Sequence, residues 1–161
     1  PSELIQLGTQ FQHPTGACGT NCGVGASEVV AAIMNMKIAA DKIQADPVLV
    51  AKANCGIPEY VDGKIVYSGT PELMATYARM VADAGARIIG GCCGTTPVHI
   101  AAMRDALDGY QAGDKPALET IEKELGSVTS GAKAQLSGDL SVAGGSLSGG
   151  RERRSRRGNR K

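Results

Sequence analysis

Five cysteines are the residues of this 161-residue chain with the clearest capacity for chemistry: Cys18, Cys22, Cys55, Cys92 and Cys93. Their number is odd and two of them are adjacent, unlike the even, spaced pattern of a secreted disulfide framework. The chain starts at Pro1 with no segment of secretory type, so we expect a reducing cytoplasm, where thiols stay reduced. Clustered cysteines in such a compartment more often bind a metal or take part in catalysis.

Three interpretations of these thiols remain open on residue types alone. A set of three thiolates suits Zn²⁺, which prefers soft ligands in a tetrahedral shell, and it leaves a fourth position for a substrate. A substrate thiol bound there is deprotonated and becomes a nucleophile at neutral pH. Alternatively, the adjacent Cys92 and Cys93, flanked by glycine on both sides, form a redox-active pair. Packing is the third interpretation, and we favour it for Cys18 and Cys55, because buried cysteine behaves as a small hydrophobic side chain.

The elements that must position these thiols alternate between helices and short apolar strands. Periodicity and start signals predict helices over 2–11, 27–45, 70–84, 96–107 and 116–125, with Ser27 capping the second, and strands over 15–18, 48–51 and 86–89. This order is typical of a parallel sheet with crossover helices. Functional groups of such folds gather at the carboxyl ends of the strands, which predicts that the cysteines share one rim. Residues 52–69 are predicted to form a loop with a tight turn at Asp62-Gly63.

The composition changes beyond residue 126. Residues 131–150 contain six glycines and four serines, and residues 151–161 carry seven basic residues and one acidic residue. The first 150 residues have a net charge near −5, so the basic character belongs to the tail. We therefore predict a folded domain over 1–126 and a flexible linker with a disordered basic tail over 127–161. The sequence contains no run of 18 apolar residues, so it predicts no membrane-spanning helix.

Three short motifs resemble those of the homocysteine S-methyltransferase family. Residues 90–97 (GGCCGTTP) look like the family signature, 19–23 (GTNCG) resemble its upstream Gly-x-Asn-Cys element, and 52–58 (KANCGIP) are similar to its Lys-x-Asn-Ala-Gly-x-Pro turn. They occur in the family's order, and the resemblance covers about residues 14–110. The run 70–94 reads like the bacterial betaine–homocysteine methyltransferase branch.

The resemblance implies a (β/α)₈ TIM barrel in which Cys22, Cys92 and Cys93 hold Zn²⁺. It further implies that zinc binds and activates the thiol of homocysteine, which takes a methyl group and becomes methionine. Betaine is the methyl donor implied by the bacterial branch. A cytoplasmic enzyme follows from this, with no membrane partner and with the number of subunits left open, a homo-oligomer included.

Some features depart from the family pattern. Position 55 is Cys where the family usually has Ala, and whether Cys55 takes part in the site stays open. The chain shows about three βα units, similar to the last three of the eight, so we expect a C-terminal part of a longer enzyme. The alternative function is a non-catalytic half-barrel whose basic tail binds nucleic acid. We regard that partner as the weaker one, because the tail has no interleaved aromatic residues.

Three polar residues near the thiols complete the candidate site. Asn21 and Asn54 follow predicted strands and are candidates for binding the amino-acid part of the substrate, although capping of a backbone turn explains them at least as well. For His99, in the first turn of a predicted helix, we favour a surface or capping role over a ligand role. We assign no general acid, general base or covalent nucleophile of the protein.

Overall fold

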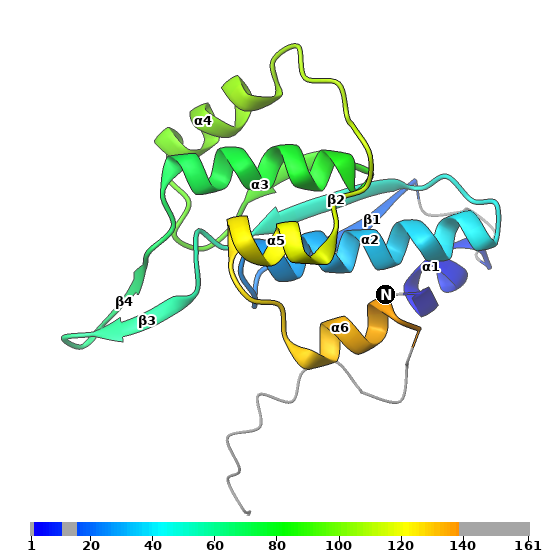
Figure 1. The fold of residues 1–161 in the computed structure, drawn as a ribbon, viewed down its shortest axis with the longest axis horizontal. Coiled ribbons are helices and arrows are strands. Elements are labelled where there is room, and N and C mark those ends of the chain that lie inside the picture. Colours follow the sequence, from blue (N-terminus) through cyan, green and yellow to red (C-terminus); the bar gives the residue numbers. More distant parts are fainter. Residues whose placement is uncertain (1, 11–15, 139–161) are drawn as a thin grey trace, which may run out of the picture.

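The fold is mixed α/β, and the computed structural model describes residues 2–10 and 16–138 (Figure 1). Its main sheet has three parallel strands in the order β1 (Ala17–Asn21), β2 (Val48–Ala53) and β5 (Ala86–Gly91). Helices alternate with these strands along the chain: α1 (Ser2–Thr9), α2 (Ala26–Lys42), α3 (Pro71–Asp83) and α4 (Pro97–Leu107). The predicted alternation and the parallel pairing are confirmed, although β1 extends three residues beyond the predicted strand.

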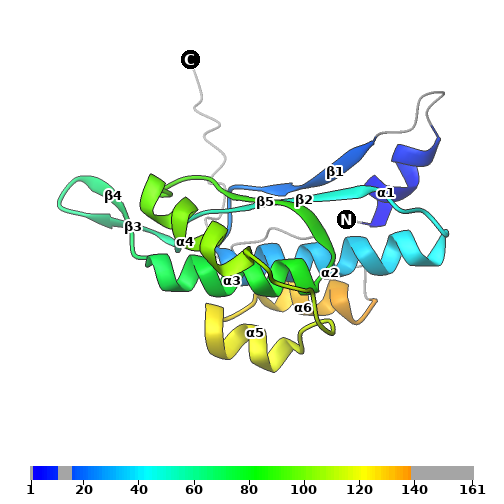
Figure 2. The same ribbon diagram turned by 90° about the horizontal axis from the view of Figure 1, so that it is seen from above.

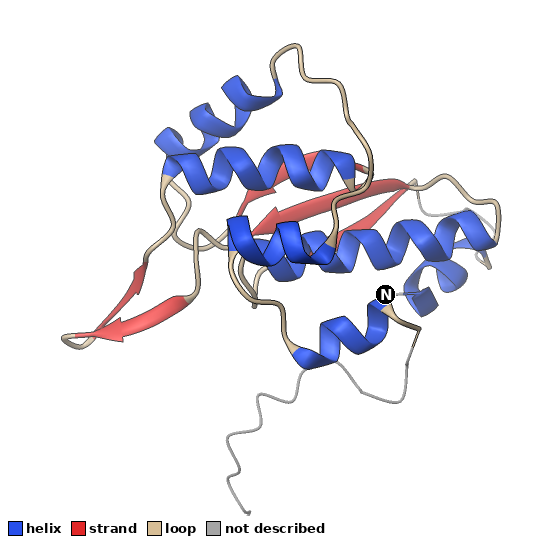
Figure 3. Cartoon of the chain, viewed as in Figure 1, coloured by secondary structure: helices blue, strands red, loops and turns tan. Residues whose placement is uncertain are grey.

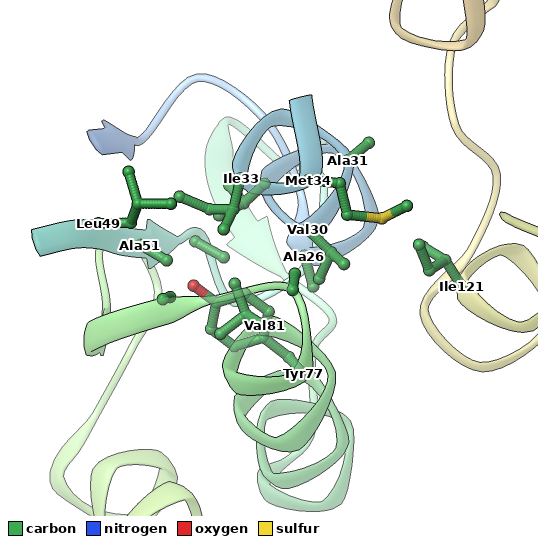
Figure 4. Close-up of a cluster of buried hydrophobic side chains, with 14 of the residues drawn as sticks. Ala26, Val30, Ala31, Ile33, Met34, Leu49, Ala51, Tyr77, Val81 and Ile121 are labelled. Atoms are coloured by element: carbon green, nitrogen blue, oxygen red, sulfur yellow. The ribbon is translucent and has the colours of Figure 1, made fainter. Parts of the chain in front are cut away.

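The hydrophobic core lies between the sheet and the layer formed by α2 and α3. Figure 2 shows this layer below the sheet, with α5 (Leu118–Leu125) and α6 (Ser130–Leu136) beneath it. In β2 the burial alternates, so Leu49, Ala51 and Ala53 face the helices. Figure 4 shows Leu49 and Ala51 within this core. From α3, Tyr77 and Val81 enter the same core at helical spacing and are fully buried.

The opposite face of the sheet is uncovered among the described residues. Lys52 of β2 is exposed, and Ile88, which pairs in register with Val50, is 50% exposed. A parallel sheet is normally covered on both faces. Within the described residues, this sheet is therefore covered on one face only.

Helix starts follow the predicted signals at α3 and α4 but not at α2. The Thr70 hydroxyl caps α3 by accepting a hydrogen bond from the N–H of Leu73 at 3.2 Å, ahead of Pro71 at the first helical position. The expected cap at Ser27 is wrong, because Gly25 is the N-cap and the helix starts at Ala26. The Ser27 hydroxyl instead donates to the carbonyl of Ser127 at 3.2 Å.

The segment predicted as a loop contains a two-stranded hairpin, β3 (Pro58–Val61) and β4 (Lys64–Tyr67), which projects from the body of the molecule (Figures 1 and 3). Its turn is at the predicted dipeptide, where Asp62 and Gly63 have φ of 49° and 81°, the geometry of a tight hairpin turn. The turn prediction is confirmed. The strands escaped prediction because their side chains are mostly exposed and carry no alternation of apolar and polar residues.

Ordered structure continues past residue 126. Val128 is buried against the core, and α6 follows it, with its N-cap Thr129 accepting from the N–H of Ala132. The basic tail and the second half of the predicted linker, together residues 139–161, lie outside the described residues. None of the helices in the described ranges is both long and apolar enough to cross a membrane.

Candidate metal centre

Three cysteine sulfurs come together at the carboxyl edge of the main sheet. Cys22 is the first residue after β1, and Cys92 and Cys93 are the first two after β5. The Sγ atoms of Cys22 and Cys93 are 3.5 Å apart, those of Cys92 and Cys93 are 3.9 Å apart, and all three lie within 4.8 Å of one another. Residues about 70 positions apart in sequence therefore form one cluster.

The backbone at Cys22 directs its sulfur into the cluster. Cys22 has φ 57°, in the left-handed region that few residues other than glycine adopt, and its N–H donates to the carbonyl of Lys52 at 3.1 Å. This hydrogen bond ties the residue to the neighbouring strand β2. The unusual conformation is thus held by sheet pairing.

The residues after β2 hold the Cys92-Cys93 turn. The N–H of Cys92 donates to the Ala53 carbonyl at 2.7 Å, and the N–H of Cys55 donates to the Cys93 carbonyl at 2.9 Å. The side chain of Asn54, 3% exposed, accepts from the N–H of Cys93 through Oδ1 at 3.2 Å. Because β2 is the middle strand, it anchors both sources of sulfur without supplying a sulfur to the cluster.

The cluster fits a tetrahedral zinc ion. Zn–S bonds of about 2.3 Å at tetrahedral angles place two sulfurs about 3.8 Å apart. Two of the three separations, 3.5 and 3.9 Å, bracket that value, and the third, between Cys22 and Cys92, is at most 4.8 Å. If the three sulfurs held zinc, one position would be open for a further ligand, as in catalytic rather than structural zinc sites.

The chain is similar to a known protein family over the region that carries the cluster. The family model of homocysteine S-methyltransferase matches residues 3–107, which include all three cysteines. The chain belongs to the homocysteine S-methyltransferase family. The mixed α/β fold with its parallel sheet is compatible with part of the α/β barrel that the sequence motifs imply.

Hydrogen bonds within the cluster of this family member shift the pKa values of Cys22 and Cys93 in opposite directions. A hydrogen bond with Cys93 lowers the pKa of Cys22, and the N–H of Gly23, the Cys92 thiol and the Asn54 side chain act in the same direction. The pKa of Cys93 is raised, chiefly by its hydrogen bonds with Cys22 and Cys92. These hydrogen bonds therefore favour the thiolate form at Cys22 and disfavour it at Cys93.

The remaining cysteines pack in the core. Cys55 is 1% exposed, and its thiol donates to the carbonyl of Gly69 at 3.2 Å. Cys18 is half-buried on β1 and packs against the core, and burial raises the pKa of both thiols. Packing, the favoured interpretation of these two residues, agrees with their positions.

The polar candidates occupy different places. Asn21 is exposed at the end of β1, whereas Asn54 is buried and holds the Cys93 backbone. The capping role expected of His99 is confirmed: its Nδ1 accepts from the N–H of Thr96 at 3.1 Å, completing the capping box of α4. The other ring nitrogen, Nε2, lies 3.3 Å from the Gly69 carbonyl.

One residue at the cluster was missed by sequence reasoning. Tyr67, the last residue of β4, packs its ring against Gly94, the residue that follows Cys93. No spacing signal relates Tyr67 to the cysteines, because the hairpin has no fixed register with the main sheet. An aromatic residue just before the helix start at Thr70 is the sole sequence feature that marks it.

Proposed function

We propose that this chain acts in zinc-dependent methyl transfer to the sulfur of homocysteine, giving methionine. The proposed zinc ligands are Cys22, Cys92 and Cys93. The observation that carries the proposal is the convergence of three sulfurs at separations of 3.5 and 3.9 Å. Membership of the homocysteine S-methyltransferase family supplies the substrate class.

Each part of the site has a task in this proposal. When bound, Zn²⁺ supplies a Lewis acid that keeps a coordinated substrate thiol deprotonated at neutral pH. The chain holds the three sulfurs in place through backbone hydrogen bonds from Cys22 and Cys92 to β2 and its extension. Positioning of acceptor and donor then accounts for much of the acceleration expected of an in-line displacement.

The asparagines are the proposed contacts for the amino-acid part of homocysteine. Asn21 is the better placed of the two, because it is exposed at the rim next to Cys22. The Oδ1 of Asn54 already accepts from the Cys93 N–H, so its contribution is chiefly to shape the rim. The proposed donor is betaine, on the likeness of residues 70–94 to the bacterial branch.

The main sheet is proposed to be three consecutive βα units of a (β/α)₈ barrel. Its uncovered face, with Val50, Lys52 and Ile88, would face the barrel interior. The outer strands β1 and β5 each pair on one side only within the described residues. The remaining strands would come from polypeptide beyond those residues, which makes the chain a part of the whole enzyme.

Zinc content of the purified full chain, measured by elemental analysis, tests the ligand set. We expect about one zinc per chain for the wild type, and a much lower content for Cys92→Ser, which loses one of three thiolates. Cys18→Ser is the matched control, because it removes a thiol of the same sheet outside the cluster. Methyl transfer to homocysteine is then compared with betaine, S-methylmethionine and a methyl folate as donors.

Two outcomes would contradict the proposal. Unchanged zinc affinity in Cys92→Ser would remove Cys92 from the ligand set. A zinc-loaded chain that transfers no methyl group, even when combined with the missing barrel strands, would reject the proposed reaction. Preference for another donor would correct the betaine assignment and leave the acceptor chemistry intact.

A further inference from the structure

The imidazole of His99 has a hydrogen-bond partner at each of its two nitrogens. Nδ1 accepts from the N–H of Thr96 at 3.1 Å and lies 2.7 Å from the Thr96 hydroxyl, whereas Nε2 lies 3.3 Å from the carbonyl oxygen of Gly69. Because a backbone N–H can only donate and a carbonyl can only accept, Nδ1 presents its lone pair and Nε2 carries the proton. The two partners thus select one neutral tautomer of His99.

The two partners of His99 belong to the starts of two different helices. Thr96 is the N-cap of α4, and Gly69 immediately precedes Thr70, the N-cap of α3. A capping box needs only the contact with Thr96, so the contact of Nε2 with Gly69 is additional to the capping function. His99 therefore joins the start of α4 to the segment that leads from the β3–β4 hairpin into α3.

Gly69 is bound in turn to the residue that holds the backbone of Cys93. Its N–H donates to the Cys55 carbonyl at 3.1 Å, and its carbonyl accepts from the Cys55 thiol at 3.2 Å. A Cβ built on Gly69 would stand 2.8 Å from the Cys55 Sγ, so no side chain fits between the two residues. The N–H of Cys55 donates to the Cys93 carbonyl at 2.9 Å. The Gly69 carbonyl is thus shared by His99 and by the residue that anchors Cys93.

These contacts form a closed loop that includes one of the proposed zinc ligands. From Cys93 the chain runs three residues to Thr96. Hydrogen bonds lead back from Thr96 to the Cys93 carbonyl through His99, Gly69 and Cys55. We propose that His99 is a positioning residue of the metal centre, which fixes the start of α4 relative to Gly69 and so holds Cys93 in place. The inference rests on the proposed function, since its consequence is for the affinity of the site for zinc.

Zinc affinity of the full chain, measured by competition with a chromophoric chelator, tests the link to Gly69. His99→Asn places an amide oxygen near the position of Nδ1, so it keeps an acceptor for the Thr96 N–H, but it has no donor at the position of Nε2. We expect zinc binding to weaken about fivefold, less than the loss for a group that contacts a ligand directly. Wild-type affinity in His99→Asn would show that capping is the whole role of His99 and would overturn the proposal.

Thr129→Ala is the matched control for the loss of one hydrogen bond at a helix start. It removes the cap of α6, a helix that supplies no residue to the cluster, so it should lower stability without changing zinc affinity. An equal loss of affinity in Thr129→Ala and His99→Asn would assign the effect to general destabilisation and overturn the positioning role.

Cobalt substitution gives a spectroscopic readout that a change in stability alone does not move. The visible ligand-field bands of Co²⁺ depend on the arrangement of the sulfurs around the ion. These bands should therefore shift in His99→Asn and coincide in wild type and Thr129→Ala. Unchanged bands in His99→Asn would show that the sulfurs keep their positions without the link to Gly69, and would overturn the proposal.

The failure of this inference is distinguishable from failure of the proposed function. If the wild type takes up neither zinc nor cobalt, the proposed metal chemistry fails, and the loop of contacts is measured on the metal-free chain. Amide hydrogen exchange of Cys55, whose N–H donates to the Cys93 carbonyl, should then be faster in His99→Asn than in wild type and unchanged in Thr129→Ala. Equal exchange in wild type and His99→Asn would overturn the positioning role.

Discussion

At the scale of single residues, the site depends on a cysteine in an unusual backbone conformation. The left-handed φ of Cys22, 57°, costs about 1–3 kcal/mol for a residue with a side chain. The hydrogen bond from its N–H to Lys52 and the thiol contact with Cys93 hold it there. Part of the stabilisation from sheet pairing thus offsets the backbone strain at Cys22, which directs its sulfur into the cluster.

Asn54 offers a test at the same scale. Asn54→Ala removes the acceptor of the Cys93 N–H, so we expect the free energy of unfolding to fall by about 0.5–1.5 kcal/mol. Zinc affinity should fall as well, because the turn carrying two ligands loosens. Urea denaturation and chelator competition measure the two effects. Asn21→Ala, at an exposed position, should change stability by less than about 0.5 kcal/mol, and a similar loss in both variants would contradict the assignment.

The cysteine cluster could be foreseen from the sequence to a large extent, and its supporting residues could not. Strand ends and residue types indicated which thiols share a rim, and the family motifs named Cys22, Cys92 and Cys93. The backbone role of Asn54 depends on the path of the chain after β2, which no pattern encodes. Tyr67 reaches Gly94 through a hairpin whose placement follows from tertiary contacts, so periodicity carries no information about it.

At the scale of elements, the ion pair that joins α5 to α6 makes the C-terminal part of the fold sensitive to acid. Glu122 accepts from the Val128 N–H at 3.0 Å and from the Lys133 ammonium at 2.9 Å. Chiefly the hydrogen bond from Lys133 holds the pKa of Glu122 below the 4.5 of an unperturbed carboxyl. A carboxyl with a depressed folded pKa stabilises the fold above its unfolded pKa, and the contribution is lost as pH falls through the folded value.

We therefore expect the docking of α6 to weaken as the pH falls below about 4.5. Glu122→Gln keeps the shape of the side chain and removes the charge, so its α6 should be loosened already at pH 7 and respond less to acid. The methyl chemical shifts of Ala132 and Leu136 during a pH titration report the docking. Glu119→Gln, an exposed carboxylate on the same helix, should retain the wild-type response. An identical response in Glu122→Gln would rule out this ion pair as the acid-sensitive contact.

At the scale of the whole molecule, the two faces of the main sheet differ in what they contribute. Leu49 is 1% exposed on the face that α2 and α3 cover, and Ile88 is 50% exposed on the other face. Leu49→Ala should cost about 2–5 kcal/mol of unfolding free energy, the range for a buried large-to-small substitution. Ile88→Ala should cost less than about 1 kcal/mol, since it removes surface that water already reaches.

Chemical denaturation of the full chain measures both variants under one condition. The contrast between them tests whether the face with Ile88 is open in solution. A cost for Ile88→Ala equal to that for Leu49→Ala would show that something covers this face, such as a second chain. In the complete barrel that we propose, the same substitution would fall in the interior and its cost would rise.

The middle position of β2 has a consequence for how this protein matures. The sulfur donors come from β1 and β5, two strands that never touch, and each is held through its own pairing with β2. A slip of one residue in either pairing would break the anchors and scatter the donors. The time at which a thiophilic ion binds during refolding would therefore report when both strand pairings have formed in the correct register. Absorption from a coloured thiophilic ion bound at the cluster would then distinguish correctly paired molecules from collapsed molecules in which a strand is out of register.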